Sequence, residues 1–501
     1  MARIFTRILK FLAGIAIGFL LSAIVSTLAV AIDFPDSLTP AIRNSTPIFK
    51  PFLGFSPTNP TLAKAVSSPG AAGMGDPFYP LMGNGGYEVE HYTLDLAVDT
   101  ERNFITGTAT LTVNATQNLS AFNLDFFGLN VEDVRIDDIQ ATFSRQGSEL
   151  TVTPATPLQN GTQFTTTVRY NGIPTPVTDP AIPIPLGWQK GSEGIFVVSQ
   201  PSGSMSWYPV NNHPTDKATY TFRVTVPNPL VVAANGILEE ATDNGMTTTY
   251  IWQMRHPMAS YLATVNIGNF RRQDEESSIG VPIRNYFPEG TPDRTMAAFR
   301  PTSDMMAFFS EMLGPYPYDV YGAIVVGPEL GGNALETQSL SAFGSFATRE
   351  TLVAHELVHQ WLGNHVTVKF WEDIWLNEGF ATYLPLLWIE DRYGKAAIED
   401  AMSQMYRELE TLRVGPPAKI AVNQMFSPSV YRRGAWTLHA LRLQVGDDIF
   451  FEILKTYSQR FAGGYVTTAD FLAVVNEVSD RDLTGFLSQW LYEETLPAYR
   501  G

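Results

Sequence analysis

The 501-residue chain contains no cysteine and only seven histidines. Without cysteine it can form no disulfide bond, no cysteine-ligated zinc site, no iron–sulfur cluster and no catalytic thiol. Charged residues are scarce as well, at 17%, and the acidic ones outnumber the basic ones, which gives a formal net charge of −17. Because binding to phosphates requires a basic surface, we do not expect a nucleic-acid partner.

The rest of the composition describes a folded protein of several domains. Apolar residues make up 45% of the chain and aromatic residues 12%, which excludes general disorder. With 39 glycines and 34 prolines, the composition favours a loop-rich body that contains strands over a long helical bundle. A metal site or a nucleophile in this chain must be built from His, Asp, Glu, Ser or Tyr.

The N-terminus combines a basic flank with a long uncharged run. Arg3, Arg7 and Lys10 precede residues 11–32, a run without charge. As a helix this run is long enough to cross a hydrocarbon core of about 30 Å, whereas the apolar region of a signal peptide is usually shorter. We therefore expect residues 1–32 to be a membrane anchor, or a signal peptide if the chain is cleaved after Ala31. In both cases the remaining chain would be exported.

Two changes of pattern divide the exported part. Residues 33–84 are rich in proline and lack periodicity, which predicts an extended tether. Residues 85–270 predict an antiparallel β domain, with a surface loop over the proline-rich stretch 173–185. The alternation of apolar and polar residues that supports this domain runs through Tyr92, Leu94, Leu96 and Val98, through Ala109, Leu111 and Val113, and through Tyr220, Phe222, Val224 and Val226.

Residues 271–501 turn from a mixed to a helical pattern. Amphipathic stretches predict helices over 296–313, 349–362, 375–393, 397–412, 430–445 and 447–461. The predicted fold class is therefore multidomain α+β, with a β domain followed by a mainly helical domain.

The string Thr351-Leu-Val-Ala-His-Glu-Leu-Val-His-Gln-Trp361 carries the chemistry. In a helix, His355 and His359 leave the same face and can bind one cation. Glu356 is displaced around the helix, where its carboxylate can reach a water molecule beside the metal without being a ligand. Hydrolytic zinc sites have three protein ligands, and Glu378 follows His359 after 18 intervening residues. Taken alone, the string could also belong to a core helix with two hydrogen-bonded histidines.

HELVHQWLGNHVT followed by WLNEGFATY resembles the thermolysin-like gluzincins, and within them the aminopeptidase N family. The resemblance covers about residues 85–500. It implies that Glu378 is the third ligand of one Zn²⁺ per chain, together with His355 and His359. It also implies a saddle-like β domain over 85–270 and a thermolysin-like catalytic domain over 271–501.

Three further stretches resemble parts of this family. Asn333-Ala-Leu-Glu-Thr337 stands in the place of its Gly-Ala-Met-Glu-Asn motif, which implies that Ala334 and Glu336 bind substrate and that Glu336 pairs with a free α-ammonium group. Tyr431-Arg-Arg-Gly-Ala435 matches its Tyr-x-Lys-Gly-Ala stretch, so Tyr431 is expected to stabilise an oxyanion. Gln200 would line the pocket for the first substrate side chain.

Two departures from the family pattern are visible. Pro385 stands where related enzymes carry an acidic residue that supports the metal site. Full-length relatives continue with a helical C-terminal domain that covers the active site, and the sequence printed here has no counterpart, so we expect an open cleft.

The sequence thus predicts an exported zinc aminopeptidase whose substrates are peptides with a free N-terminus. Glu356 and Tyr431 would be catalytic. A zinc endopeptidase with an open cleft, and a non-catalytic surface protein that retains the fold, are the alternatives. Side-chain preference and oligomeric state are not predicted.

Overall fold

The structure is a computed structural model, which describes residues 67–499. The predicted anchor or signal peptide over 1–32, and the predicted tether up to residue 66, lie outside the described residues. None of the helices between residues 67 and 499 is long and apolar enough to cross a membrane.

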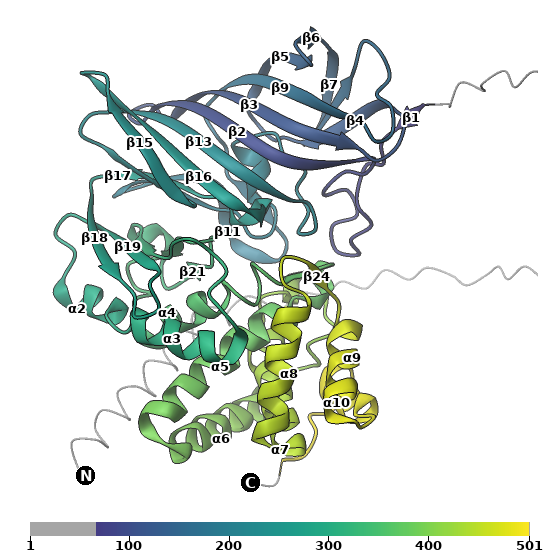
Figure 1. Cartoon of the computed structure of the whole chain (residues 1–501), viewed down its shortest axis with the longest axis vertical. Coiled ribbons are helices and arrows are strands. Elements are labelled where there is room, and N and C mark those ends of the chain that lie inside the picture. The colour runs from purple at the N-terminus through teal and green to yellow at the C-terminus, as the bar shows by residue number, and fades with distance from the viewer. Residues whose placement is uncertain (1–66, 500–501) are drawn as a thin grey trace, which may run out of the picture. The chain divides into compact units, whose positions relative to one another are not determined.

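An eight-stranded sheet forms the upper layer of the described chain (Figure 1). The predicted alternation is confirmed, because the apolar positions of its long strands point to one face and are buried. In spatial order the strands are β15 (Ile237–Asp243), β16 (Thr247–Ala259), β13 (Lys217–Pro227), β2 (Tyr87–Asp99), β3 (Phe104–Ala115), β9 (Gln163–Gly172), β5 (Asn130–Ile136) and β6 (Ile139–Gln140).

This sheet is not wholly antiparallel, contrary to the sequence-based prediction. β13 pairs with β2 in parallel, with Tyr220 opposite Tyr92. A parallel neighbour requires a long crossover, and here the chain between the two strands builds most of two further sheets. The first contains β1 (Ser68–Pro69), β4 (Leu119–Asp125), β8 (Glu149–Thr153) and β7 (Thr142–Gln146); the second contains β10 (Val177–Asp179), β11 (Ile182–Gly191), β12 (Gly194–Val198), β17 (Val265–Gly268) and β14 (Val231–Ala234).

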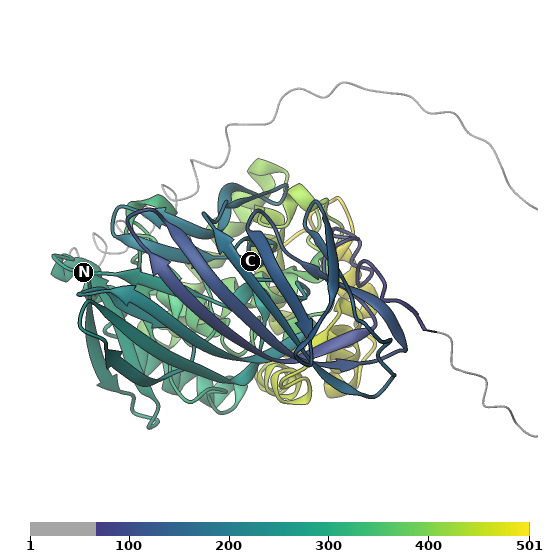
Figure 2. The ribbon, with the colours of Figure 1, turned by 90° about the horizontal axis from the view of Figure 1, so that it is seen from above.

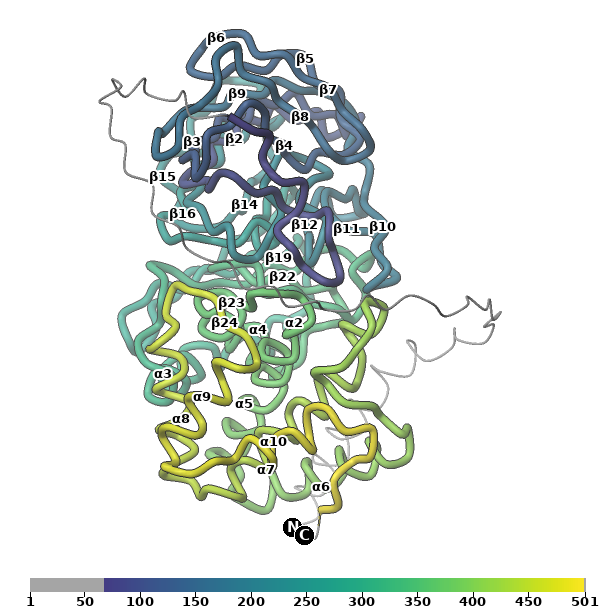
Figure 3. The backbone as a smooth tube through the Cα atoms, turned by 90° about the vertical axis from the view of Figure 1, so that its right-hand side faces the viewer, coloured from purple at the N-terminus to yellow at the C-terminus, as the bar shows by residue number. Residues whose placement is uncertain are grey.

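Two segments that were predicted to be irregular belong to the folded body. Residues 67–84, the end of the predicted tether, reach down to the helical part (Figure 3), where Asp76 accepts a hydrogen bond from the backbone of Trp371 at 2.7 Å. The predicted loop over 173–185 instead contains β10 and the start of β11. Asp179 in β10 is buried and accepts a hydrogen bond from the Tyr79 hydroxyl at 2.7 Å. Each segment is therefore held by contacts distant in sequence.

The helical part begins with a mixed five-stranded sheet. Its spatial order is β18 (Phe270–Glu276), β19 (Pro282–Pro288), β20 (Ala323–Val325), β22 (Ser341–Phe343) and β21 (Ala334–Leu335). β19, β20 and β22 run parallel, whereas β21 is antiparallel to β22 and forms an edge. β23 (Thr367–Val368) and β24 (Tyr465–Val466) form a separate two-stranded parallel sheet.

Helices beneath these sheets carry most of the remaining chain, as the view from above also shows (Figure 2). Each of the six predicted stretches contains an α-helix, although the one predicted over 296–313 begins only at Thr302 and the one predicted over 349–362 ends at Val358. The helices are α2 (Asp293–Met296), α3 (Thr302–Leu313), α4 (Glu350–Val358), α5 (Trp375–Tyr393), α6 (Lys395–Leu412), α7 (Gly434–Val445), α8 (Asp447–Arg460), α9 (Thr468–Ser479) and α10 (Thr484–Leu491). The sheets and helices of the described residues form one compact unit. The boundary between the β domain and the helical domain at residue 270 therefore stays a prediction.

Candidate active site

α4 carries two of the predicted ligands. His355 lies in its last turn, and His359 caps its C-terminal end with helical backbone angles. The i, i+4 spacing brings the two imidazoles together, with 3.1 Å between their Nε2 atoms. His359 Nδ1 lies 3.1 Å from the Leu362 carbonyl oxygen, which fixes Nδ1 as the hydrogen-bond donor and leaves Nε2 free to face the site.

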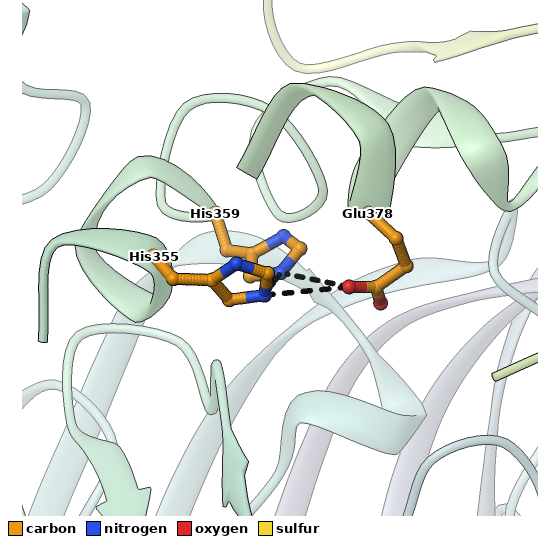
Figure 4. A group of neighbouring side chains, drawn as sticks. All are labelled: His355, His359 and Glu378. Atoms are coloured by element: carbon orange, nitrogen blue, oxygen red, sulfur yellow. Dashed lines mark hydrogen bonds and ion pairs between the residues drawn. The ribbon is translucent and has the colours of Figure 1, made fainter. Parts of the chain in front are cut away.

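The third predicted ligand comes from the next helix. Glu378, in the first turn of α5, places Oε2 3.4 Å from Nε2 of each histidine (Figure 4). The three side chains are at most 13% exposed. Their ligand atoms all lie within 4.8 Å of one another, close enough to hold one metal ion. Two imidazole nitrogens and a carboxylate oxygen are the donor set of many catalytic zinc sites.

The electrostatics of the cluster also favour a cation. Burial alone would lower the pKa of His359, but the carboxylates of Glu378 and Glu336 outweigh it and raise this pKa to about 10. Burial alone would raise the pKa of Glu378, but the two histidines outweigh it and lower this pKa to about 2. The buried carboxylates therefore stabilise a positive charge between the three side chains, and a divalent cation bound there would supply it. The residues present fit a zinc ion.

Two more buried carboxylates stand beside the ligands. Glu336, Glu356 and His359 also have ligand atoms within 4.8 Å of one another. Burial raises the pKa of Glu356 well above its ordinary value, although His359 opposes the shift. Burial, with Glu378 adding to it, likewise raises the pKa of Glu336 to about 7. Glu336 can therefore hold or release a proton near neutral pH.

The structure brings Glu336 and Gln200 together across the two parts of the chain. Gln200 Nε2 donates a hydrogen bond of 2.9 Å to Glu336 Oε1. Glu336 directly follows β21, which includes the half-buried Ala334. Its backbone carbonyl accepts hydrogen bonds from Asn364 Nδ2 at 2.7 Å and Gln360 Nε2 at 3.2 Å.

Tyr431 lies on a π-helical turn, η7 (Ser429–Arg433), directly before α7. Its ring stacks on that of His355, with 6.1 Å between centroids and 12° between planes. Burial and the surrounding carboxylates raise the pKa of the phenol well above its ordinary value, so Tyr431 remains a hydrogen-bond donor.

A pair of glycines, whose role the sequence did not reveal, sets the distance between this turn and α5. A Cβ atom on Gly379 would lie 3.1 Å from Gly434 Cα, and one on Gly434 would lie 3.1 Å from Gly379 Cα. The two backbones therefore approach directly, next to Glu378 on one side and the Tyr431 turn on the other. Pro385 lies further along α5, which continues through it without a break.

Sequence reasoning also missed three polar residues that support the site. Gln360 and Asn364 fix the backbone of Glu336, as described above. Lys217, at the start of β13, donates hydrogen bonds of 3.0 Å to the carbonyl oxygens of Asn364, His365 and Gly464. Gln360 and Asn364 stand within the quoted string HELVHQWLGNHVT, but the contacts of all three residues join segments distant in sequence and leave no local pattern.

The fold and the ligand set are together those of a zinc metallopeptidase. Residues 298–490 match the Peptidase family M1 domain, and residues 88–262 match the Peptidase M1 N-terminal domain. An M1 zinc metallopeptidase from Deinococcus radiodurans has a similar structure, with a TM-score of 0.80 and 33% sequence identity over 85% of this chain and 98% of that one. The chain therefore belongs to the M1 peptidase family, with a β-rich N-terminal domain and a helical catalytic domain.

Curated relatives give the same family with lower identity. Aminopeptidase M1-A of Oryza sativa is 24% identical over 81% of this chain and 50% of its own length. Aminopeptidase M1 of Arabidopsis thaliana is 27% identical over 60% of this chain and 36% of its own length. The chain thus spans half or less of these two relatives. A variant of the Deinococcus enzyme has been solved with the substrate Tyr-Ser-Ala bound, again at 33% identity and a TM-score of 0.80, over 85% of this chain and 99% of that one.

Proposed function

We propose that this chain is a zinc-dependent aminopeptidase that removes residues from the free N-terminus of peptides. The convergence of His355, His359 and Glu378 beside the buried carboxylates of Glu356 and Glu336 carries the proposal. The names of the curated relatives support it.

The three ligands would hold one zinc ion, a Lewis acid that makes water more acidic and polarises a peptide carbonyl. Glu356 would accept the proton of the attacking water and pass it to the nitrogen of the leaving amine. Its position suits this exchange, because its carboxylate lies beside His359, with their ligand atoms within 4.8 Å of one another, and is itself buried.

Tyr431 would stabilise the carbonyl oxygen as that atom becomes negatively charged. The phenol keeps its proton because burial and nearby carboxylates disfavour the phenolate. A donor aimed at such a developing charge is worth about 3–4 kcal/mol of transition-state stabilisation.

Glu336 would bind the α-ammonium group of the substrate and so select the first peptide bond. Gln200 occupies one of its carboxylate oxygens and fixes the orientation of the other. The backbone of Ala334, on the edge strand β21, is available to pair with the substrate backbone.

Free and N-acetylated forms of one peptide test this assignment in the zinc-loaded protein. We expect cleavage of the first bond in the free form only, and we expect Glu336→Gln to raise KM for it. Equal cleavage of both forms would instead indicate an endopeptidase. A purified protein without stoichiometric zinc would favour the non-catalytic surface protein.

We also infer that residues 1–32 export the protein and anchor it in the membrane, with the catalytic domain outside the cytoplasm. The inference rests on the uncharged run over 11–32 and its basic flank. Extraction of cell membranes with alkaline carbonate tests it, because an anchored protein stays with the membrane. Recovery of the full-length chain in the cytosol would refute it.

A further inference from the structure

A pocket of about 520 Å³ opens at the carboxyl ends of the three parallel strands β19, β20 and β22. Its walls are the segments that follow these strands, residues 288–292, 325–328 and 345–348, and Glu193 from the hairpin between β11 and β12. The carboxyl ends of parallel strands are a common place for ligands in open sheets. None of the proposed catalytic residues lines this pocket.

The pocket adjoins the segment that leads to Glu336. Residues 327–333 connect its wall to β21, and Phe346 N donates a hydrogen bond of 3.2 Å to the carbonyl oxygen of Gly331. The β11–β12 hairpin is fastened at the same end, where Ser192 N donates to Glu329 Oε1 at 2.7 Å. β12 thus extends from the pocket to the Gln200–Glu336 contact.

Burial fixes the direction in which a bound peptide can leave Glu336. The residues that follow it, Thr337 to Leu340, are wholly buried. The residues that precede it become exposed at Asn333 and Gly332. This difference in exposure favours a peptide that runs from Glu336 along β21 toward Gly332, antiparallel to this edge strand.

Length decides which peptides can reach the pocket. The segment from Glu336 back to Asn333 is extended beside β22 and covers three residue steps, or about 10 Å at about 3.3 Å per residue. Residues 330–333 then form a turn, in which Asn333 N donates a hydrogen bond of 3.2 Å to the Leu330 carbonyl oxygen. An aminoacyl anilide or a dipeptide ends short of this turn. A longer peptide would carry its fifth and sixth residues past the turn, toward the pocket.

The lining favours particular side chains at these positions. Phe346 is 70% exposed, so an extended chain can cover its ring. The lining also includes two exposed carboxylates, those of Glu193 and Glu289, and one guanidinium, that of Arg294. The excess of negative charge favours a basic side chain over an acidic one, more strongly at low salt.

We propose that this pocket binds the fifth and sixth residues of a peptide substrate, with a preference for basic side chains there. The proposal rests on the proposed aminopeptidase function. It implies that oligopeptides of at least five residues are cleaved more efficiently than dipeptides.

Steady-state kinetics of the zinc-loaded protein test the proposal with a leucyl anilide and with leucyl hexapeptides that end in two lysines or two glutamates. We expect Phe346→Ser to lower kcat/KM for the dilysine hexapeptide about tenfold and to leave the anilide unchanged. Tyr393→Ser is the matched control, because Tyr393 is 66% exposed and lies at the end of α5. It should alter neither substrate.

A double variant tests the preference for basic side chains. Glu193→Gln combined with Glu289→Gln should abolish the preference for the dilysine over the diglutamate hexapeptide. The proposal is overturned if Phe346→Ser affects the anilide and the hexapeptide equally, or affects neither, or if the wild type does not distinguish the two hexapeptides. A wild type that cleaves no anilide with zinc bound would instead refute the aminopeptidase function itself.

Discussion

Lys217 offers the sharpest test of how the β domain supports the catalytic residues. Its ammonium group is buried and donates three hydrogen bonds of 3.0 Å, all to backbone carbonyls of the catalytic domain. Two of these carbonyls belong to Asn364 and His365, in the loop that follows His359. Asn364 in turn donates to the Glu336 carbonyl at 2.7 Å. One side chain thus fixes the loop that orients His359, a proposed metal ligand, and Glu336, the proposed binding group for the substrate amine.

Lys217→Met keeps the length of the side chain and removes every donor. A hydrogen bond to a charged group contributes about 1.5–3 kcal/mol, and a buried group left without a partner costs about 1–3 kcal/mol. Two of the three carbonyls keep another donor, because Thr367 Oγ1 donates to the Asn364 carbonyl at 2.9 Å and Thr367 N donates to the Gly464 carbonyl at 3.2 Å. We therefore expect the free energy of unfolding to fall by about 2–3 kcal/mol. Zinc affinity should fall as well, because the loop also carries the acceptor for His359 Nδ1.

Urea unfolding and a zinc titration at pH 6 measure both effects. Burial lowers the pKa of Lys217 to about 7, so the ammonium form is present at this pH. Lys190→Met is the matched control, since Lys190 donates one exposed hydrogen bond, to the Glu101 carbonyl at 2.8 Å, and its loss should change stability by less than about 0.5 kcal/mol. If the two variants were equally stable, or if Lys217→Met bound zinc as tightly as the wild type, the reasoning would be refuted.

Four further outcomes are expected. Glu356→Gln should retain stoichiometric zinc by metal analysis and lose at least about 100-fold in kcat; near wild-type turnover would exclude it as the base. Tyr431→Phe should lower kcat about 100-fold or more with little change in KM, and an effect on KM alone would contradict its oxyanion role. A chelator should abolish turnover, and added zinc should restore it; activity that survives chelation would rule out a metal mechanism. Burial raises the pKa of Asp125 to about 8, so the folded state keeps a proton that the unfolded state has released above about pH 4. Stability should therefore fall as the pH rises from 5 to 8, and Asp125→Asn should remove this part of the slope in urea titrations.

The clustering of the three proposed ligands could be predicted from sequence because their spacing is local. His355 and His359 are one helical turn apart, and Glu378 lies in the first turn of α5, the next α-helix. Residues that stand close together in the sequence motif are therefore also close in space. The strands were predictable for a related reason, since alternation reports burial of one face. Alternation is the same for parallel and antiparallel neighbours, which explains why the parallel pairing of β13 with β2 was missed.

Contacts between distant segments could not be predicted. Asp76 and Trp371 are 295 residues apart, and Lys217 and Asn364 are 147 apart. Proline content suggested a tether over 33–84. Composition cannot reveal that residues 67–84 are held in place by hydrogen bonds to distant residues. A buried lysine at the start of a strand has no sequence signature either, since lysine is normally exposed.

The glycine pair at Gly379 and Gly434 has a consequence for the engineering of this site. Since no side chain separates the two backbones, no change of rotamer can adjust the spacing between Glu378 and Tyr431. The metal ligand and the phenol are thereby held on a common rigid frame. Mutagenesis aimed at new substrates can vary Gln200 and the surface around Phe346, whereas a side chain at either glycine would force the facing backbone to move by a few tenths of an ångström.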